Sequence, residues 1–292
     1  SGAIAVQQLK DGSLKKARKS QMMALRSPND NVIAQAVFQK IEFGVALDGP
    51  GLGQAIRSSN EALLLQHWAS GEPDGAEVQA RLWYEQEPFS SRPVQLLALL
   101  NIYKADYTAA HSWLTLGLKS DPNADELIVN MAYLKVRLGK LDEAQQLLIK
   151  ARRLEKKHEP FTKATEGLIC YVHKEFSFGD LLYKDAMEGF VKAGNPHMMA
   201  YCSLFMALHA AEYGHPLVEQ HIAVANDLIT RYPSADTNIF LKLRNAESLV
   251  KPVDIVSSDP RNLQQLIYDQ RNNVLTIKRG VQTRDAARLV NK

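Results

Sequence analysis

The chain has 292 residues, of which 46% are hydrophobic and 23% are charged, and its net charge is +3. This composition is ordinary for a globular protein that buries a sizeable core, and the length suits one large domain or two modest ones. No stretch approaches eighteen consecutive apolar residues, so the sequence excludes a membrane-spanning helix. The two cysteines, Cys170 and Cys202, exclude a disulfide framework or a cysteine-based zinc site. Both lie in apolar helical patterns and are predicted to be small buried side chains.

The charge is unevenly distributed. Residues 1–27 carry six basic side chains against one acidic, and residues 261–292 carry seven against two, so each end has a charge of +5. The segment between them, 28–260, has 22 basic and 29 acidic residues and a charge of −7. Basic ends suit contacts with nucleic acid or with an acidic partner, and they equally suit solvated helices. The sequence leaves both interpretations open.

The chain begins with Ser1, Gly2 and Ala3, which resemble the remnant of a cleaved tag. We therefore expect an excised fragment, before which a signal peptide or a catalytic domain could be missing. A cytoplasmic location is expected, and a periplasmic one stays open for the same reason. Residues 1–27 are predicted to form a basic arm or helix.

Helical periodicity dominates the rest of the chain, and short loops marked by Gly or Pro interrupt it. In residues 28–89, we predict helices that pack on the repeats described below. The first starts near Asn29, and the next two cover about 52–68 and 76–86. From Pro93 the predicted helices are paired: 93–104 with 107–119, 125–138 with 141–156, 161–174 with 181–192, and 197–213 with 217–231. In residues 233–292 we predict a capping helix (237–251), a linker, a helix from Arg261, a strand within Asn273–Gly280 and a basic tail.

The second helices of these pairs repeat a pattern of side-chain size. At a shift of 34 residues, Tyr107 aligns with Leu141, Ala110 with Ala144, Leu114 with Leu148 and Gly117 with Ala151. A third copy follows with Tyr183, Ala186, Phe190 and Ala193, shifted by 42 residues, and we assign the eight extra residues to an enlarged turn within "KEFSFGDLL". The fourth copy, Gly214–Asp227, is still the second helix of a predicted pair, but it lacks the small residues of the pattern. Small side chains at the alanine positions let two helices approach closely, and the large ones fill the groove of the next pair.

This pattern resembles the tetratricopeptide repeat, a 34-residue helix–turn–helix. The resemblance covers about residues 90–232. It implies an all-α fold, a right-handed superhelical solenoid of antiparallel helix pairs with capping helices at both ends and a concave side. The usual aromatic residue of the first helix is replaced by Asn101 and Lys135.

Motifs for chemistry are sparse. The stretch Gly49–Gln54 has glycines typical of a phosphate loop but no following Lys-Ser/Thr, which favours a helix–helix turn. His209, His215 and His221 lack the i, i+4 spacing of a zinc helix, and no Cys or carboxylate completes a metal set in the sequence. Acids such as Asp180 are explained by a helix start. We therefore predict no catalysis, no metal and no cofactor in this fragment.

The resemblance also implies which residues line the concave face, because first-helix residues recur there every 34 positions. Three such columns read Gln95–Val129–Lys163, Leu99–Tyr133–Gly167 and Tyr103–Arg137–Tyr171. Tyr and Arg are frequent anchors of protein interfaces. The predicted partner-binding residues are Gln95, Leu99, Tyr103, Asn130, Tyr133, Arg137, Lys163 and Tyr171. Tyr103 and Arg137 are expected to be partly exposed on one side of the solenoid.

These observations favour a scaffold or adaptor that holds a peptide or a partner domain. The set does not match the Lys/Asn clamp that some of these proteins use for chaperone carboxylates. Two alternatives remain open. The chain can be a regulatory or recruiting part of a larger enzyme or secretion apparatus, or its basic ends can bind nucleic acid.

Overall fold

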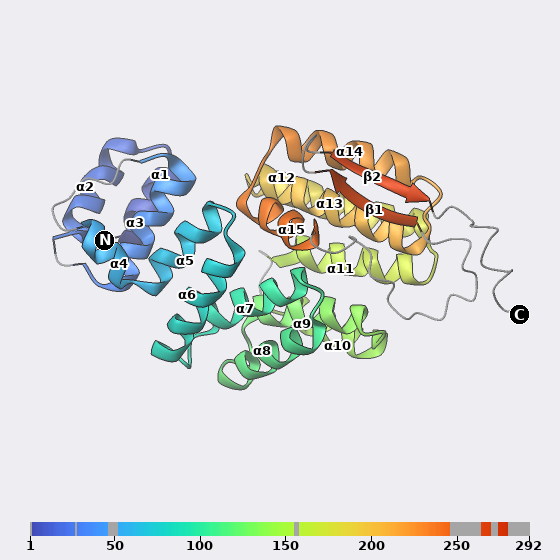
Figure 1. Cartoon of the computed structure of the whole chain (residues 1–292), viewed down its shortest axis with the longest axis horizontal. Coiled ribbons are helices and arrows are strands. Elements are labelled where there is room, and N and C mark those ends of the chain that lie inside the picture. The colour runs from blue at the N-terminus through green and yellow to red at the C-terminus, as the bar shows by residue number, and fades with distance from the viewer. Residues whose placement is uncertain are drawn as a thin grey trace, which may run out of the picture. The chain divides into compact units, whose positions relative to one another are not determined.

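The structure is a computed structural model that describes residues 2–26, 28–45, 52–154, 158–245, 264–269 and 274–279. Within these ranges the regular structure is helical apart from one β-hairpin (Figure 1). No helix in the described ranges is long and apolar enough to cross a membrane. The predicted linker and most of the basic tail lie outside the described residues, as do residues 49–51 of the Gly-rich stretch.

The chain divides into two compact units. Unit 1 comprises residues 1–101 and 112–122, and unit 2 comprises residues 102–111 and 123–292. The division passes within two helices of the first predicted repeat and not at residue 90.

The helices before residue 90 belong to unit 1. They are α1 (Gly2–Lys10), α2 (Leu14–Ala24), α3 (Asp30–Phe43), α4 (Leu52–Ser58), α5 (Asn60–Ala69) and α6 (Pro73–Gln86). The basic segment 1–27 is thus a helical hairpin, in which α1 packs against α2 and also against α3. Asn29 caps α3 as the sequence indicates, because its side chain accepts a hydrogen bond from the Val32 amide.

The prediction of one continuous helix over 52–68 is wrong, because the structure has two helices there. The structure breaks it at Ser59, whose backbone is extended and whose hydroxyl accepts a hydrogen bond from the Ala62 amide at 3.3 Å. A serine in this conformation satisfies one of the unpaired amides at a helix start, so it begins α5 as a new helix. α5 and α6 then pack together, and Leu64, Ala80, Trp83 and Leu97 form a core in unit 1.

The paired helices follow the predicted order. They are α7 (Ser91–Tyr103), α8 (Tyr107–Ser120), α9 (Asp125–Arg137), α10 (Leu141–Arg152), α11 (Glu159–Val172), α12 (Phe176–Lys192), α13 (Pro196–Tyr213) and α14 (Val218–Arg231). In unit 2, α9 packs against α10, α11 against α12 and α13 against α14. Neighbouring pairs also touch, because α11 contacts α9 and α10, and α13 contacts α11 and α12.

The predicted enlarged turn after α11 is wrong. The turn is short, with Lys174 in the left-handed region at φ 63° and the Glu175 amide bonded to the Cys170 carbonyl at 2.9 Å. The extra residues instead lengthen α12, which begins at Phe176 and is 17 residues long. Phe176, Gly179 and Tyr183 recur at helical spacing on the side that packs against Tyr171 of α11, which favours a helix over a loop.

The predicted pattern of side-chain size agrees with burial in the structure. The small residues Ala110, Ala144 and Ala186 are fully buried, and the large residues Leu114, Leu148 and Phe190 are also buried. Cys170 and Cys202 are free thiols in the core, as expected, and burial raises the pKa of Cys202 to about 12.

The end of the chain forms α15 (Ala235–Asn245) and a hairpin of β1 (Gln264–Asp269) and β2 (Val274–Arg279). The strands are antiparallel, with Gln264 opposite Arg279 and Asp269 opposite Val274. β1 contacts α13 and α15, and β2 contacts α14 (Figure 1). The predicted strand is confirmed, and the helix predicted from Arg261 is wrong over 264–269. A strand needs a partner for its backbone groups, and β1 is the partner of β2; Ile267 and Tyr268 in β1 are of types enriched in strands.

We expect Ala144→Trp to destabilise the protein by about 1–3 kcal/mol or more, because the bulky ring overpacks a close helix contact. Gln145→Trp is the matched control, since Gln145 is the next residue of α10 and is exposed. Urea unfolding followed by circular dichroism measures both. Equal midpoints for Ala144→Trp and the parent would contradict the repeat alignment.

Candidate functional site

The residues expected to form an exposed stripe are buried in unit 2. Tyr103, Arg137 and Tyr171 are 1%, 3% and 0% exposed. The expectation that Tyr103 and Arg137 are partly exposed is therefore wrong. The physical reason is that later elements of the same chain cover these positions: α13 and α15 at Tyr103, α13 at Arg137, and α12 with the turn before α14 at Tyr171.

Tyr103 is the last residue of α7, and its partners come from far along the chain. Its hydroxyl accepts a hydrogen bond from the Tyr201 hydroxyl of α13 at 2.6 Å. Its ring stacks edge-on against Phe240 of α15, with centroids 5.4 Å apart. Phe205 of α13 also packs on Phe240 at 4.8 Å, which closes an aromatic cluster around Tyr103. A partner could reach Tyr103 only by displacing these rings.

Arg137 ends α9 and forms a buried ion pair with Glu212 of α13. Both guanidinium Nη atoms donate to the carboxylate, with Nη2 2.8 Å from Oε1, and Nε donates to the Tyr107 hydroxyl at 3.0 Å. Burial alone would raise the pKa of Glu212, but the Arg137 charge holds that pKa below its ordinary value. Bidentate pairing of this kind satisfies both charges out of water. The guanidinium is consequently fully engaged within the chain.

Tyr171 of α11 lies at the junction of α12 and the turn before α14. Its hydroxyl donates to Asp180 Oδ1 at 2.5 Å, and its ring lies 5.4 Å from Tyr183 and 5.2 Å from His215. Burial is the main reason that the pKa of Tyr171 is raised, and the Asp180 carboxylate raises it further. The Tyr171 hydroxyl is therefore bonded to Asp180 within the fold, and the buried side chain is not accessible to a ligand.

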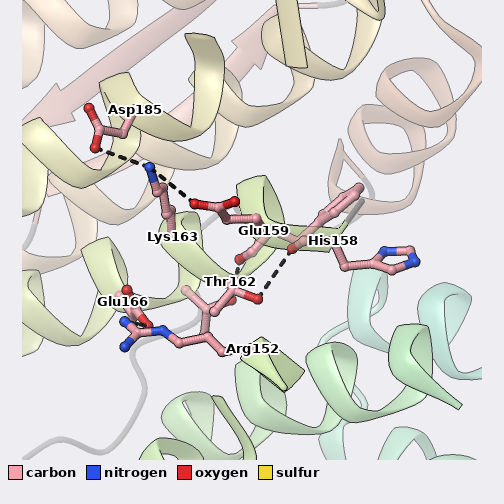
Figure 2. Close-up of polar contacts among 9 residues, drawn as sticks. Arg152, His158, Glu159, Thr162, Lys163, Glu166 and Asp185 are labelled. Carbon is pink, nitrogen blue, oxygen red and sulfur yellow. Dashed lines mark hydrogen bonds and ion pairs between the residues drawn. The ribbon is translucent and has the colours of Figure 1, made fainter. Parts of the chain in front are cut away.

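Lys163 is another predicted site residue that the structure engages in ion pairs. Its Nζ lies 3.3 Å from Asp185 Oδ2 and 3.6 Å from Glu159 Oε1. Figure 2 shows the ammonium group between these two carboxylates, with the Arg152–Glu166 pair nearby. Exposed ion pairs contribute little to stability. They nevertheless pair the Lys163 ammonium group, which was predicted to contact a partner, with carboxylates of the same chain.

The remaining predicted residues differ in their surroundings. Tyr133 is half-buried against α13, with its hydroxyl 3.4 Å from His209 Nε2 and its ring 6.1 Å from Phe205. Gln95, Leu99 and Asn130 are partly exposed. Gln95 and Leu99 belong to unit 1, and Asn130 belongs to unit 2. Contact of these residues with a partner stays a prediction.

Gly167, which shares a predicted column with Leu99 and Tyr133, faces α12 and not a groove. A Cβ at Gly167 would lie 2.8 Å from the Tyr183 ring and 3.1 Å from the Gly179 carbonyl oxygen. A Cβ at Gly179 would lie 2.5 Å from the Tyr171 ring. The two glycines therefore let α11 and α12 approach closely. This column position serves packing within the pair.

His209 of α13 is buried between two tyrosines. The Tyr183 hydroxyl lies 2.7 Å from Nδ1, and the Tyr133 hydroxyl lies 3.4 Å from Nε2. Burial lowers the pKa of His209 to about 3, and the charges of Arg137 and Arg244 add to this effect. The ring is neutral at physiological pH and links α9, α12 and α13.

Sequence reasoning missed two clusters of possible metal ligands. Asp180, His215 and His221 lie with one ligand atom each within 4.8 Å of one another, and so do Asp125, Glu126 and His158. The expectation that no carboxylate completes a set with these histidines is wrong, because folding brings Asp180 to His215 and His221. Asp180 is also not at the helix start, since α12 begins four residues earlier. The available signal was the pair His215 and His221 flanking one helix start, which does not reveal a third ligand.

Removing one partner of the buried ion pair should destabilise the protein strongly. We expect Arg137→Met to lower the free energy of unfolding by about 3–5 kcal/mol, because it leaves the Glu212 carboxylate buried and unpaired. The double variant Arg137→Met, Glu212→Leu should lose less than the single one. Urea unfolding of the parent, both single variants and the double variant measures the coupling. Additive losses would show that the two charges do not interact.

The buried His209 should make the protein acid-sensitive. Its folded pKa is lowered, so the unfolded state takes up a proton below about pH 6.5 while the folded state does not, and stability falls as the pH falls. Between pH 6.5 and 5 we expect this residue to account for a loss of about 1.5 kcal/mol. His209→Gln should remove that part of the slope in unfolding measurements across this range. An unchanged slope would mean that His209 titrates normally in the folded protein.

Comparison with protein-family models, with curated proteins and with solved structures gave no match in any of the three. The resemblance to tetratricopeptide repeats therefore rests on the spacing of residues such as Ala144 and Ala186. The function has to be argued from the surfaces and clusters of this chain.

Proposed function

We propose that this chain is a protein-interaction scaffold built from stacked helix pairs of the tetratricopeptide type, which binds a protein partner on α12. The support for the architecture is the order of packing in unit 2. Successive pairs α9–α10, α11–α12 and α13–α14 contact the next pair along the chain. Equivalent positions in the second helices, Ala144 and Ala186, are both fully buried. Stacking of this kind is how repeat proteins bury apolar stripes that one pair cannot bury alone.

The observation that carries the binding site is a pair of exposed apolar side chains on α12. Phe178 and Leu181 are 56% and 53% exposed. They are three residues apart on one helix, so their side chains are neighbours on its surface. Gly179 and Asp180 between them turn inward toward Tyr171. Large apolar side chains that gather at the surface are typical of protein contact sites.

Apolar side chains are also exposed at equivalent positions of two second helices. Ile149 of α10 and Val191 of α12 each follow the large buried residue of the repeat pattern, and both are exposed. The inner side of the first helices is less accessible, since Tyr103, Arg137 and Tyr171 have partners within the chain. A partner with an apolar contact segment, such as an amphipathic helix, fits the outer surface better.

This proposal is tested by a charge-introducing double variant. We expect Phe178→Glu, Leu181→Glu to abolish partner binding while leaving the melting temperature nearly unchanged, because both side chains are exposed. Affinity capture from extracts of the source organism, with quantitative mass spectrometry, identifies a partner by its loss in this variant. Val78→Glu on α6 is the control, since Val78 is equally exposed and lies in unit 1. Capture that is identical for all three proteins would refute the α12 site.

A further inference from the structure

Three side chains that bind metals in other proteins meet in unit 2. Asp180 lies on α12, His215 lies in the turn between α13 and α14, and His221 lies in the first turn of α14. His215 Nε2 is 3.1 Å from Asp180 Oδ1, and His221 Nε2 is 3.3 Å from the same oxygen. We propose that Asp180, His215 and His221 form a binding site for a divalent transition-metal ion of the Zn²⁺ type.

The distances fit a tetrahedral ion. Zinc binds histidine nitrogen and carboxylate oxygen at about 2.0–2.2 Å, and tetrahedral geometry then places two ligand atoms about 3.3 Å apart. Both nitrogen–oxygen distances in the cluster are close to this value. Two nitrogens and one oxygen are also the donor types that such ions prefer over Ca²⁺ or Mg²⁺. Three protein ligands leave the fourth position for water or another group.

The ligand atoms are held in place: Asp180 Oδ1 accepts a hydrogen bond from Tyr171, and the two histidine nitrogens face it. His215 is 3% exposed, and within the described residues the buried Nε2 atoms of His215 and His221 make no well-aligned hydrogen bond. Both nitrogens face the same Asp180 oxygen without a well-aligned hydrogen bond to it, and an ion bound to all three atoms would satisfy them together. The Tyr171 hydroxyl orients Asp180 through its 2.5 Å hydrogen bond, as outer residues commonly orient a ligating carboxylate.

One contact must change when the ion binds. The Leu217 amide donates to His215 Nδ1 at 2.9 Å, so the metal-free neutral ring carries its proton on Nε2. Binding at Nε2 moves the proton to Nδ1, and the Leu217 amide must then find another acceptor. One neutral hydrogen bond corresponds to about ten-fold in affinity, which is small beside the gain from three metal ligands. The turn from His215 to Leu217 is therefore expected to rearrange.

The test uses the whole chain, stripped of metal by a chelator and dialysed. Zinc chloride is titrated by calorimetry, and cobalt chloride is added separately because the visible absorption of Co²⁺ reports four-coordination. We expect one saturable site at this cluster, intense cobalt bands, a raised melting temperature and a shift of the Leu217 amide signal in NMR spectra. His221→Ala and Asp180→Asn should each weaken binding at least about 100-fold. If one of these variants does not fold, the other still decides the result.

Two controls separate this site from other histidines. His173→Ala removes an exposed histidine of unit 2 outside the cluster and should leave binding unchanged. His158→Ala disrupts the second cluster, with Asp125 and Glu126, and should not affect the cobalt bands of the proposed site. No saturable binding to the parent, or binding that survives in folded His221→Ala and Asp180→Asn, overturns the proposal. In that event the three residues form a hydrogen-bonded cluster only.

Discussion

The organisation of unit 2 depends on one buried ion pair, between Arg137 of α9 and Glu212 of α13. The two side chains are only 2% and 8% exposed, so each charge requires the other, and Tyr107 satisfies the remaining guanidinium nitrogen. The two residues are 75 positions apart in the sequence. Their pairing holds the end of α13 against α9, and the contacts of Tyr201 with Tyr103 and of His209 with Tyr133 follow along the same helix.

This arrangement makes α13 a core helix with polar contacts, and it explains why the expected binding stripe is not accessible. Residues of the types that anchor peptides are present on α7, α9 and α11, but they contact other parts of the same chain. Tyr103 and Arg137 contact α13, and Tyr171 contacts α12 and the turn before α14. The partner site that we propose instead is on α12, where Phe178 and Leu181 are exposed. The cluster of Asp180, His215 and His221 lies on the inward side of the same segment of α12, so the two proposals concern opposite sides of one helix.

Much of the fold could be predicted from local pattern. The helix predicted over 125–138 occurs at Asp125–Arg137, and the one predicted over 107–119 occurs at Tyr107–Ser120. Their ends follow from Gly, Pro and acidic start residues, whose effects act within one turn. The predictions were wrong where a second local feature or a distant partner, and not the helical period alone, decided the structure. Ser59 acts as a cap inside a continuous apolar pattern. The segment "KEFSFGDLL" was interpreted as an enlarged turn because of the repeat shift, and β1 can be recognised only with its partner strand.

The sequence by itself determined which segments are helical and which of their faces are buried, because side-chain size and period act between residues three or four apart. The burial of Ala144, Leu148, Ala186 and Phe190 follows from that pattern. Only the tertiary structure decided the accessibility of Tyr103, Arg137 and Tyr171, and only it joined Asp180 to His215 and His221. The contacts of Tyr103 and Arg137 with α13 span 98 and 75 residues. Contacts of such length depend on the sum of all intervening packing, which no local pattern contains.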